Sequence, residues 1–402
     1  MGIDNAPEIL DKGIQKIEEI KTAKEQRGDM ETFTIEAPDW IEAHRELGAK
    51  LGDRINEIVE TKTAKLDAKA LNEELTFAAG IRKFIEARAG ENKQVSPRIK
   101  EYLDCLQAWG EGANLKEIKG FSVLDVAIWL QNDNVGCQTL LYKGKNGATY
   151  ILHTEEEPTG PVEKPTGKVD KPRLVTFKVN GAENKKEINS FLYPDLLPGA
   201  AFGWQTDGDR VYFQAIDALF LKNPEKPASL ANMLAWLALT GGEYDAVENL
   251  VKECGPYVDG YAVNMVELNG KGSESRAKRI LFAHDISSSR KFNLREDAYS
   301  FQGNLIPEED SDAFKDVEDH NFTQREYYER RLTRMKEILR LTKSLVNKEA
   351  MKSSFFEILK RIAAFRVGDG FAMANKDVVA AGVFEFSKSG FKHEVIAGPA
   401  MK

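Results

Sequence analysis

Apolar residues recur at helical spacing through the first third of the chain. Residues 38–63 place Trp40, Leu47 and Leu51 along one stripe, and that spacing gives a helix a single apolar face. Further helices are predicted over residues 7–25, 66–88, 96–112 and 121–131. The chain is therefore expected to begin with a charged, helical region.

The pattern changes after residue 137, where apolar runs of strand length alternate with turn residues. The runs QTLLY (138–142) and TYILH (149–153) flank the turn KGKNGA, which predicts a hairpin. Further strands are predicted over 173–179, 201–205, 210–216, 261–268, 279–285, 377–387 and 392–398, and further helices over 230–241, 245–254 and 321–345. Hairpins separated by helices predict an α+β fold, with two antiparallel sheets sandwiched by helices rather than a doubly wound parallel sheet.

The composition is that of a soluble globular protein. Of the 402 residues, 42% are hydrophobic and 30% are charged, and no apolar run approaches the roughly 18 residues of a membrane span. The first residues lack the apolar segment of an export signal. Cys105, Cys137 and Cys254 show no CxxC spacing, which argues against zinc and redox motifs. We expect a cytoplasmic protein with no membrane partner.

Charge and motif spacing argue against several other partners and cofactors. The formal net charge of −8 disfavours a general nucleic-acid binder, which presents a basic face to phosphates. The segment GPVEKPTGKV fails the spacing of a phosphate loop. The acidic run from Glu308 to Asp312 lacks the spacing and glycine of an EF-hand, and the five histidines are scattered. We expect no metal, no cofactor and no nucleic-acid partner.

Gly136-Cys137 stands immediately before the predicted hairpin, where self-cleavage would create an N-terminal nucleophile. A thiol is only a few per cent ionised near neutral pH, whereas a freed α-amino group, with a pKa of about 8, can accept its proton. Because Gly136 has no Cβ, it can adopt the strained backbone that an N-to-S acyl shift requires. Taken alone, a cysteine beside an apolar run is more often a buried structural thiol. The surrounding sequence favours the nucleophile.

Several segments in the last two-thirds of the chain resemble one known family. In order they are VGCQTLLYKGKNGATYILHTEE, LPGAAFGWQTDGDRVYFQAIDAL, GGEYDAVENLVKECGPYVDGYAVNMVEL, FQGNLIPEED and AAGVFEFSKSGFKHEVIAGP. In this order they are similar to the isopenicillin-N acyltransferase-like group of N-terminal-nucleophile (Ntn) cysteine hydrolases. The resemblance implies an αββα four-layer sandwich with an N-terminal helical prosegment. It also implies that the precursor cleaves itself between Gly136 and Cys137.

The resemblance implies roles for four further residues. Glu155 falls at the position of the Asp that ends the family's nucleophile hairpin, and it keeps the carboxylate one methylene longer. Asn304 falls where the family places an amide that faces the oxyanion. His153 replaces a family Asn in the hairpin, and Asp217 stands where relatives often have Asn. We therefore treat His153 and Asp217 as secondary candidates.

The residues leave alternatives open at two of these positions. Glu155 could orient the Cys137 amine, bind a substrate amine, or be the first of a solvated acidic triplet with Glu156 and Glu157. His153, whose ordinary pKa is about 6.5, could pair with Cys137 as a conventional base if no cleavage occurs.

Together these observations predict three regions and one activity. Residues 1–95 form a helical N-terminal extension, 96–136 form the prosegment that leads to the cleavage site, and 137–402 form the αββα domain. The expected activity is that of a self-processing Ntn cysteine amidohydrolase, which cleaves the amide bond of an acylated amine or peptide-like small molecule through a Cys137 acyl-thioester. The alternatives are an acyl-CoA-dependent N-acyltransferase and a non-catalytic, unprocessed scaffold. The two fragments are expected to be partners after cleavage, and a homo-oligomer is possible.

Overall fold

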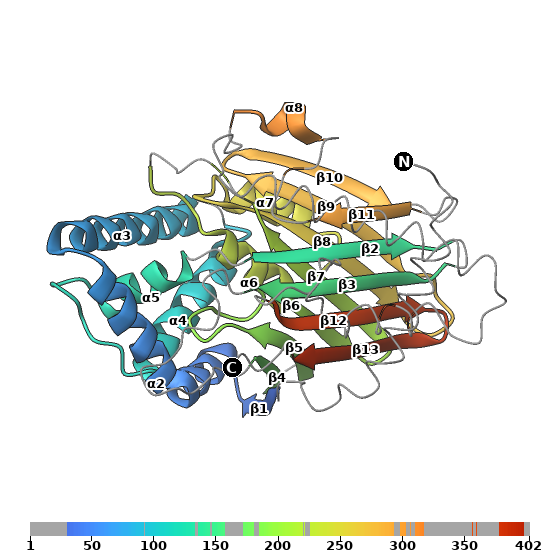
Figure 1. Cartoon of the computed structure of the whole chain (residues 1–402), viewed down its shortest axis with the longest axis horizontal. Helices are drawn as coiled ribbons and strands as arrows, with labels where there is room; N and C mark the ends of the chain where they lie inside the picture. Colours follow the sequence, from blue (N-terminus) through green and yellow to red (C-terminus); the bar gives the residue numbers. More distant parts are fainter. Residues whose placement is uncertain are drawn as a thin grey trace, which may run out of the picture.

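Two β-sheets and seven helices make up the part of the chain that the structure, a computed structural model, describes (Figure 1). The described residues are 30–91, 93–132, 136–144, 147–156, 172–180, 185–219, 221, 226–292, 298–302, 306, 310–316, 356, 359 and 378–397. The predicted α+β class is confirmed. The helices predicted over residues 7–25 and 321–345 lie outside these ranges.

The larger sheet has eight strands in the order β1-β4-β5-β6-β7-β8-β9-β10. They are β1 (Glu31–Ala37), β4 (Arg173–Asn180), β5 (Lys185–Leu192), β6 (Phe202–Asp207), β7 (Arg210–Ala218), β8 (Gly260–Asn269), β9 (Arg276–Ala283) and β10 (Ile286–Phe292). Neighbouring strands are antiparallel, except that β1 runs parallel to β4. A tight turn joins β6 to β7, with Gly208 at a φ of 58°, a conformation that glycine adopts without steric cost.

The smaller sheet has five strands in the order β11-β2-β3-β12-β13. They are β11 (Ala298–Gln302), β2 (Gly136–Lys143), β3 (Thr149–Glu156), β12 (Val378–Ser387) and β13 (Gly390–Ala397). All four pairings are antiparallel. The hairpin predicted after Gly136 is therefore confirmed as β2 and β3.

The sequence patterns did not predict four of these strands: β1, β5, β10 and β11. β1 lies within the region expected to be a helical extension, yet it forms one edge of the larger sheet. Its sequence ETFTIEA alternates polar and apolar residues, and its burial follows that alternation, as expected of a strand with one buried face. The N-terminal region is thus joined to the rest of the fold through the backbone of a sheet.

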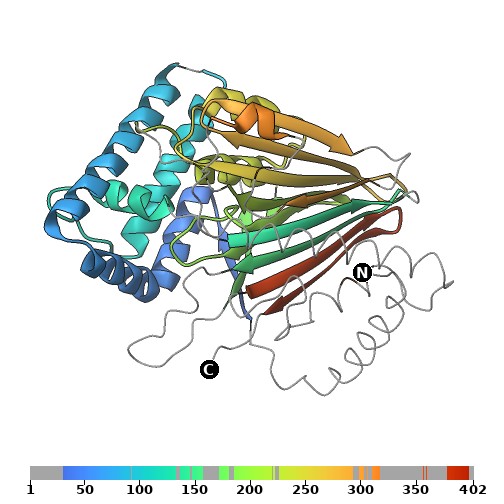
Figure 2. The ribbon, with the colours of Figure 1, turned by 45° about the horizontal axis from the view of Figure 1, so that its top comes forward.

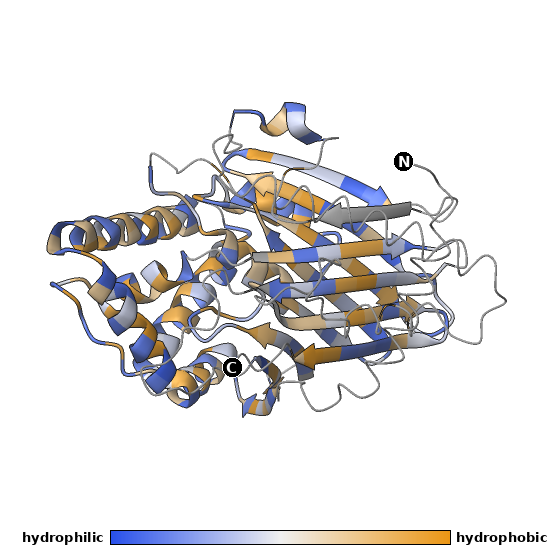
Figure 3. Ribbon diagram, viewed as in Figure 1, coloured by the Kyte–Doolittle hydropathy of each residue, from blue (hydrophilic) through white to orange (hydrophobic). Residues whose placement is uncertain are grey.

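The two sheets pack face to face, with alternate side chains of each strand filling the space between them. On β7, Val211 and Phe213 belong to the cluster between the sheets, whereas Tyr212 and Ile216 belong to the cluster on the other face. Phe384 of β12 packs against Phe213, with ring centroids 4.4 Å apart. Apolar residues, orange in Figure 3, run along the strands of both sheets. The period-two pattern of the sequence therefore determines which side chains enter this interface.

Helices cover the outer face of the larger sheet. Helix α6 (Ala231–Gly241) packs on β6, β7 and β8, and α7 (Val247–Cys254) packs on β10. The outer face of the smaller sheet carries an apolar cluster that includes Leu140 and Leu152 together with two helical residues, Phe356 and Leu359. The larger sheet thus lies between these helices and the smaller sheet.

The remaining helices gather mainly at one end of the sheets (Figure 2). They are α2 (Trp40–Lys65), α3 (Ala68–Glu91), α4 (Ser96–Gly112) and α5 (Val123–Gln131), and the short α8 (Ser311–Phe314) lies beside β10. The helices predicted over 38–63, 66–88, 96–112 and 121–131 are confirmed. α2 and α4 approach closely because Gly48 has no side chain, and a Cβ there would collide with the carbonyl oxygen of Trp109. Among the described helices, none has the length and apolar character that crossing a bilayer requires.

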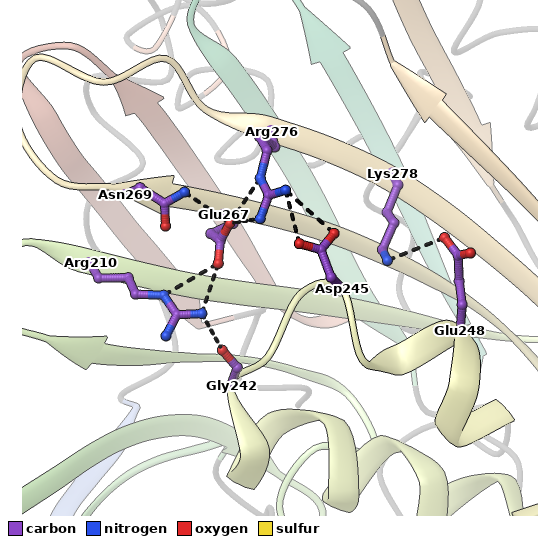
Figure 4. A network of polar contacts seen from close by, with 8 residues as sticks. All are labelled: Arg210, Gly242, Asp245, Glu248, Glu267, Asn269, Arg276 and Lys278. Carbon is purple, nitrogen blue, oxygen red and sulfur yellow. Dashed lines mark hydrogen bonds and ion pairs between the residues drawn. The ribbon is translucent and has the colours of Figure 1, made fainter. Parts of the chain in front are cut away.

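Ion pairs around the buried Glu267 hold the connection between α6 and α7 against the larger sheet (Figure 4). Glu267 accepts hydrogen bonds from Arg210 Nη2 at 2.8 Å and from Arg276 Nε at 2.9 Å. Arg276 also pairs with Asp245 at 3.0 Å, and Arg210 Nη2 donates to the Gly242 carbonyl at 3.1 Å. Burial alone would raise the pKa of Glu267, but these arginines outweigh it and hold the pKa below its usual value. Glu267 therefore stays ionised and connects two strands to this loop.

Candidate active site

Cys137 lies near the start of β2 and faces the larger sheet. In the β2–β3 register it stands opposite Glu155, and Thr139 stands opposite His153. Because side chains alternate along a strand, these four residues share one face of the hairpin. That face contacts β7. The local alternation thus brings a thiol, a hydroxyl, an imidazole and a carboxylate to one place between the sheets.

The Cys137 thiol is buried and hydrogen-bonded. Its exposed fraction is 1%, and Sγ donates to the carbonyl oxygen of Ile216 on β7 at 3.1 Å. Gly136 precedes it as a strand residue opposite Glu156. The bond predicted to be cleaved therefore lies within the sheet and not in a solvated loop.

Glu155 is fully buried, which overturns the alternative that it begins a solvated acidic triplet. Its Oε1 lies 2.6 Å from His153 Nε2, and its Oε2 accepts a hydrogen bond of 2.8 Å from the Tyr193 hydroxyl. That alternative arose because two further acidic residues follow Glu155 directly along the chain. The alternation of side chains along β3, and not the acidic composition, determines that Glu155 points inward.

His153 stands opposite Thr139 in the register, not opposite Cys137. Its Nδ1 lies 2.7 Å from the Thr139 hydroxyl, and the ring is fully buried. A direct Cys137–His153 pair, one of the alternatives from the sequence, is therefore not what this register favours. The imidazole instead connects Glu155 to Thr139.

Asp217 lies on β7 and completes the cluster from the opposite sheet. Its Oδ2 accepts hydrogen bonds from the Thr139 hydroxyl at 2.6 Å and from Asn264 Nδ2 at 2.8 Å. Its Oδ1 is buried and has no hydrogen-bond partner in the described part of the chain. Burial raises the pKa of Asp217 to about 7, although the nearby His153, Thr139 and Cys137 favour the ionised form. This carboxyl group can therefore gain or lose a proton near neutral pH.

The structure brings together four of the residues that the sequence singled out: Cys137, His153, Glu155 and Asp217. The fifth, Asn304, lies outside the described residues, as do its neighbours 303 and 305. Within the described ranges, no three His, Cys, Asp or Glu side chains are grouped so that they could hold a metal ion.

The sequence interpretation missed three members of the cluster: Thr139, Tyr193 and Asn264. Thr139 lies two residues after Cys137, so strand alternation alone could have placed it on the same face. Asn264 is the polar residue inside the apolar run YAVNMVEL, and a polar side chain in such a run must find a buried partner. Tyr193 follows a strand that was not predicted, so no local pattern pointed to it.

The chain that leads into Cys137 is anchored at the end of α5. The carbonyl oxygen of Gln131 accepts a hydrogen bond of 2.5 Å from Asn232 on α6. The Gln131 side chain donates to Asp195 O at 2.7 Å and accepts from Leu197 N at 3.0 Å. Both ends of the short segment between residues 131 and 137 are therefore held by the surrounding fold.

The arrangement combines the groups that acyl chemistry requires. It offers a thiol, a carboxyl group that titrates near neutral pH, and a hydrogen-bonded pair of imidazole and carboxylate, all shielded from water. No model of a known protein family matches this chain, and no curated protein matches its sequence.

Proposed function

We propose that this chain is a self-processing Ntn cysteine amidohydrolase with an αββα fold. In this account the precursor cleaves the bond between Gly136 and Cys137, and Cys137 then attacks the amide bond of an acylated amine or peptide-like small molecule. The one observation that carries the proposal is the buried cluster around Cys137, which gathers His153, Glu155 and Asp217 from two facing sheets.

The position of Cys137 supports the proposal. Cys137 is the second residue of β2, and its thiol faces the larger sheet. After cleavage it would be the first residue of that strand, with its thiol already directed into the cluster. A structural thiol needs only apolar neighbours. This one is surrounded by titratable groups that cost free energy to bury. Such groups are retained most often where they perform chemistry.

The proposed reaction proceeds through a thioester. The α-amine of Cys137 takes the thiol proton, and the thiolate attacks the carbonyl carbon of the substrate amide. The amine product leaves with a proton from the Cys137 ammonium, so that the acyl group remains on Sγ. Water then gives a proton to the α-amine and attacks the thioester, which releases the acid and restores the thiol.

Two further residues have proposed roles in this reaction. Glu155 stands directly opposite Cys137 in the register, so its carboxylate can hold the new ammonium group in place. The resemblance assigns Asn304 to the oxyanion, and removing one donor of this kind costs roughly 3 to 4 kcal/mol of transition-state stabilisation in other enzymes.

Covalent trapping tests the proposed nucleophile. The purified protein is treated with β-lactones that carry different acyl chains, and the adduct is located by mass spectrometry. We expect one acyl group on Cys137 and none on Cys105 or Cys254, because burial raises the pKa values of those two thiols well above their ordinary value. Modification of all three thiols at similar rates, or of none, would contradict the proposal.

A non-catalytic scaffold is the second candidate, and the burial of the Cys137 thiol favours it. A scaffold predicts that the purified protein keeps its full mass of 45.0 kDa and that Cys137→Ala behaves like the wild type. The hydrolase proposal predicts two fragments from the wild type and one intact chain from the variant.

A further inference from the structure

Self-cleavage needs a base that the mature enzyme does not. Before the bond is cut, the nitrogen of Cys137 belongs to an amide and cannot accept the thiol proton. Another group must take that proton in the precursor. The inference below rests on the proposed function and concerns this first step.

The precursor places an unbroken row of hydrogen-bonding side chains beside Cys137. The Thr139 hydroxyl bonds to Asp217 Oδ2 at 2.6 Å and lies 2.7 Å from His153 Nδ1. His153 Nε2 in turn lies 2.6 Å from Glu155 Oε1. All four side chains have an exposed fraction of 0%, so water does not compete for these bonds.

The Thr139 hydroxyl can point in either of two directions. When Asp217 is ionised, the hydroxyl donates to it and must accept from His153, so Nδ1 carries a proton. When Asp217 is protonated, the carboxyl group donates to Thr139, and the hydroxyl then donates to an unprotonated Nδ1. The second arrangement leaves the ring proton on Nε2, facing Glu155. Reversing the direction of these hydrogen bonds therefore passes a proton between Asp217 at one end of the row and Glu155 at the other.

We propose that Asp217 is the base of self-cleavage and that Thr139 and His153 relay its proton to and from Glu155. The side chain of Asp217 contacts the Cys137 side chain, and Asp217 Oδ1, which has no hydrogen-bond partner in the described part of the chain, is the atom proposed to receive the thiol proton. In this proposal Thr139 and His153 act through Asp217 and not on the scissile bond itself. They are positioning residues that set the protonation state of Asp217.

The proposed self-cleavage proceeds through a thioester. Asp217 takes the proton from Cys137 Sγ, and the thiolate attacks the carbonyl carbon of Gly136. The C–N bond breaks as Asp217 returns the proton to the departing nitrogen, which becomes the free α-amine. Water then gives a proton to that amine and attacks the thioester, the C–S bond breaks, and the thiolate recovers a proton. The products are the Gly136 carboxylate and a free Cys137.

The charges around Asp217 set the pH at which the step should work. Three titratable groups act on it: His153 and Cys137 favour its ionised form, and Glu155 opposes it. The hydrogen bond from Thr139 also favours ionisation. Loss of that bond should raise the pKa of Asp217, so that cleavage requires a higher pH.

Substitutions at Thr139 separate a relay from simple packing. Self-cleavage of the full chain is followed by mass spectrometry for the wild type, Thr139→Val and Thr139→Ser. Each protein is brought by a pH jump to one of a series of final values between pH 5 and pH 9. Valine keeps the shape of threonine and removes the hydroxyl, whereas serine keeps the hydroxyl and removes the methyl group. Asn264 still donates to Asp217 in both variants.

The relay predicts that Thr139→Val cleaves at least about tenfold more slowly than Thr139→Ser and that the acid limb of its pH profile moves upward. His153→Gln should slow cleavage as well, and the double variant should be no slower than the slower single variant, because both break one row. Cleavage of Thr139→Val at the wild-type rate, or slower cleavage of Thr139→Ser than of Thr139→Val, would overturn the relay alone. A wild-type chain that stays intact would overturn the proposed function and the relay together.

Discussion

At the scale of single residues, the central feature is the burial of two carboxyl groups and one imidazole in a single site. Asp217, Glu155 and His153 have no exposed surface. Burying ionised groups costs free energy unless partners compensate them. These groups are therefore expected to lower the stability of the fold, a cost that is common at active sites.

Replacing Asp217 by Asn should show this balance. Because burial raises the folded-state pKa of Asp217 to about 7 from 3.8, its ionised form opposes folding, and this cost grows as the pH rises from about 4 to 7. In a Cys137→Ala background, Asp217→Asn should raise the free energy of unfolding by on the order of 4 kcal/mol at pH 8 and by less than half of that at pH 5. Urea unfolding at the two pH values measures the difference. A gain that does not depend on pH would show that the folded-state pKa of Asp217 is not raised above its ordinary value.

The sequence indicated most of the site because the residues lie on a hairpin. Cys137, His153 and Glu155 fall on two adjacent strands, so local alternation determines that they share a face. The partners Tyr193 and Asn264 come from β5's far end and from β8, and only the packing of the sheets brings them near. A local pattern carries no information about such partners.

At the scale of elements, His44 joins α2 to α6. His44 Nε2 accepts a hydrogen bond of 3.1 Å from Trp236 Nε1, and Nδ1 donates to Trp40 O at 2.6 Å. The ring also stacks on Phe177 of β4, with centroids 6.1 Å apart. Both nitrogens are satisfied only when the ring is neutral.

Protonation of His44 in acid should therefore weaken the contact between α2 and α6. Burial lowers the pKa of His44 to about 4 from 6.5, so its contribution to stability is complete above pH 6.5 and is lost as the pH falls toward 4. Between these values the Cys137→Ala chain should lose about 3 kcal/mol more stability than the same chain with His44→Phe, as measured by urea unfolding. Equal losses in the two chains would show that the pKa of His44 is not lowered in the folded state.

The ion-pair network around Glu267 should contribute measurably to the free energy of unfolding. Glu267 is 2% exposed, but its partners Arg210 and Arg276 are 42% and 46% exposed, which screens the pairs. Glu267→Gln should lower the free energy of unfolding by about 2 kcal/mol, less than for a fully buried pair. Lys271→Ala, which removes an exposed pair of 3.8 Å with Asp209, is the matched control and should cause no measurable loss. Equal effects of the two changes would contradict the role of burial.

Helices were easier to predict from the sequence than strands. The helical period of α2, α3 and α4 is contained within each segment. β1 was missed because its partner β4 is remote: Glu31 and Arg173 form an ion pair although they are 142 residues apart. A short strand at a sheet edge is stabilised by that distant pairing more than by its own sequence.

At the scale of the whole molecule, the described elements before Cys137, from β1 to α5, share a core with the rest of the fold. β1 extends the larger sheet, His44 packs against α6, and Gln131 is held by Asn232. Cutting the chain after Gly136 breaks none of these contacts. The N-terminal fragment should thus remain as a subunit and not leave as a propeptide.

Gel filtration of the cleaved protein tests that expectation. Both fragments should elute together under native conditions and separate only in denaturant, because their shared apolar core has no stable alternative in water. Loss of the N-terminal fragment without denaturant would show that the contacts of β1 and α2 do not survive cleavage.

The most direct test of the whole account is N-terminal sequencing of the purified wild-type protein beside Cys137→Ala. We predict that the wild type yields a second chain that begins at Cys137, with the sequence CQTLLY, and that the variant stays as one chain of 45.0 kDa. A wild type that remains one uncut polypeptide, or one cut at another bond, would contradict the central claim.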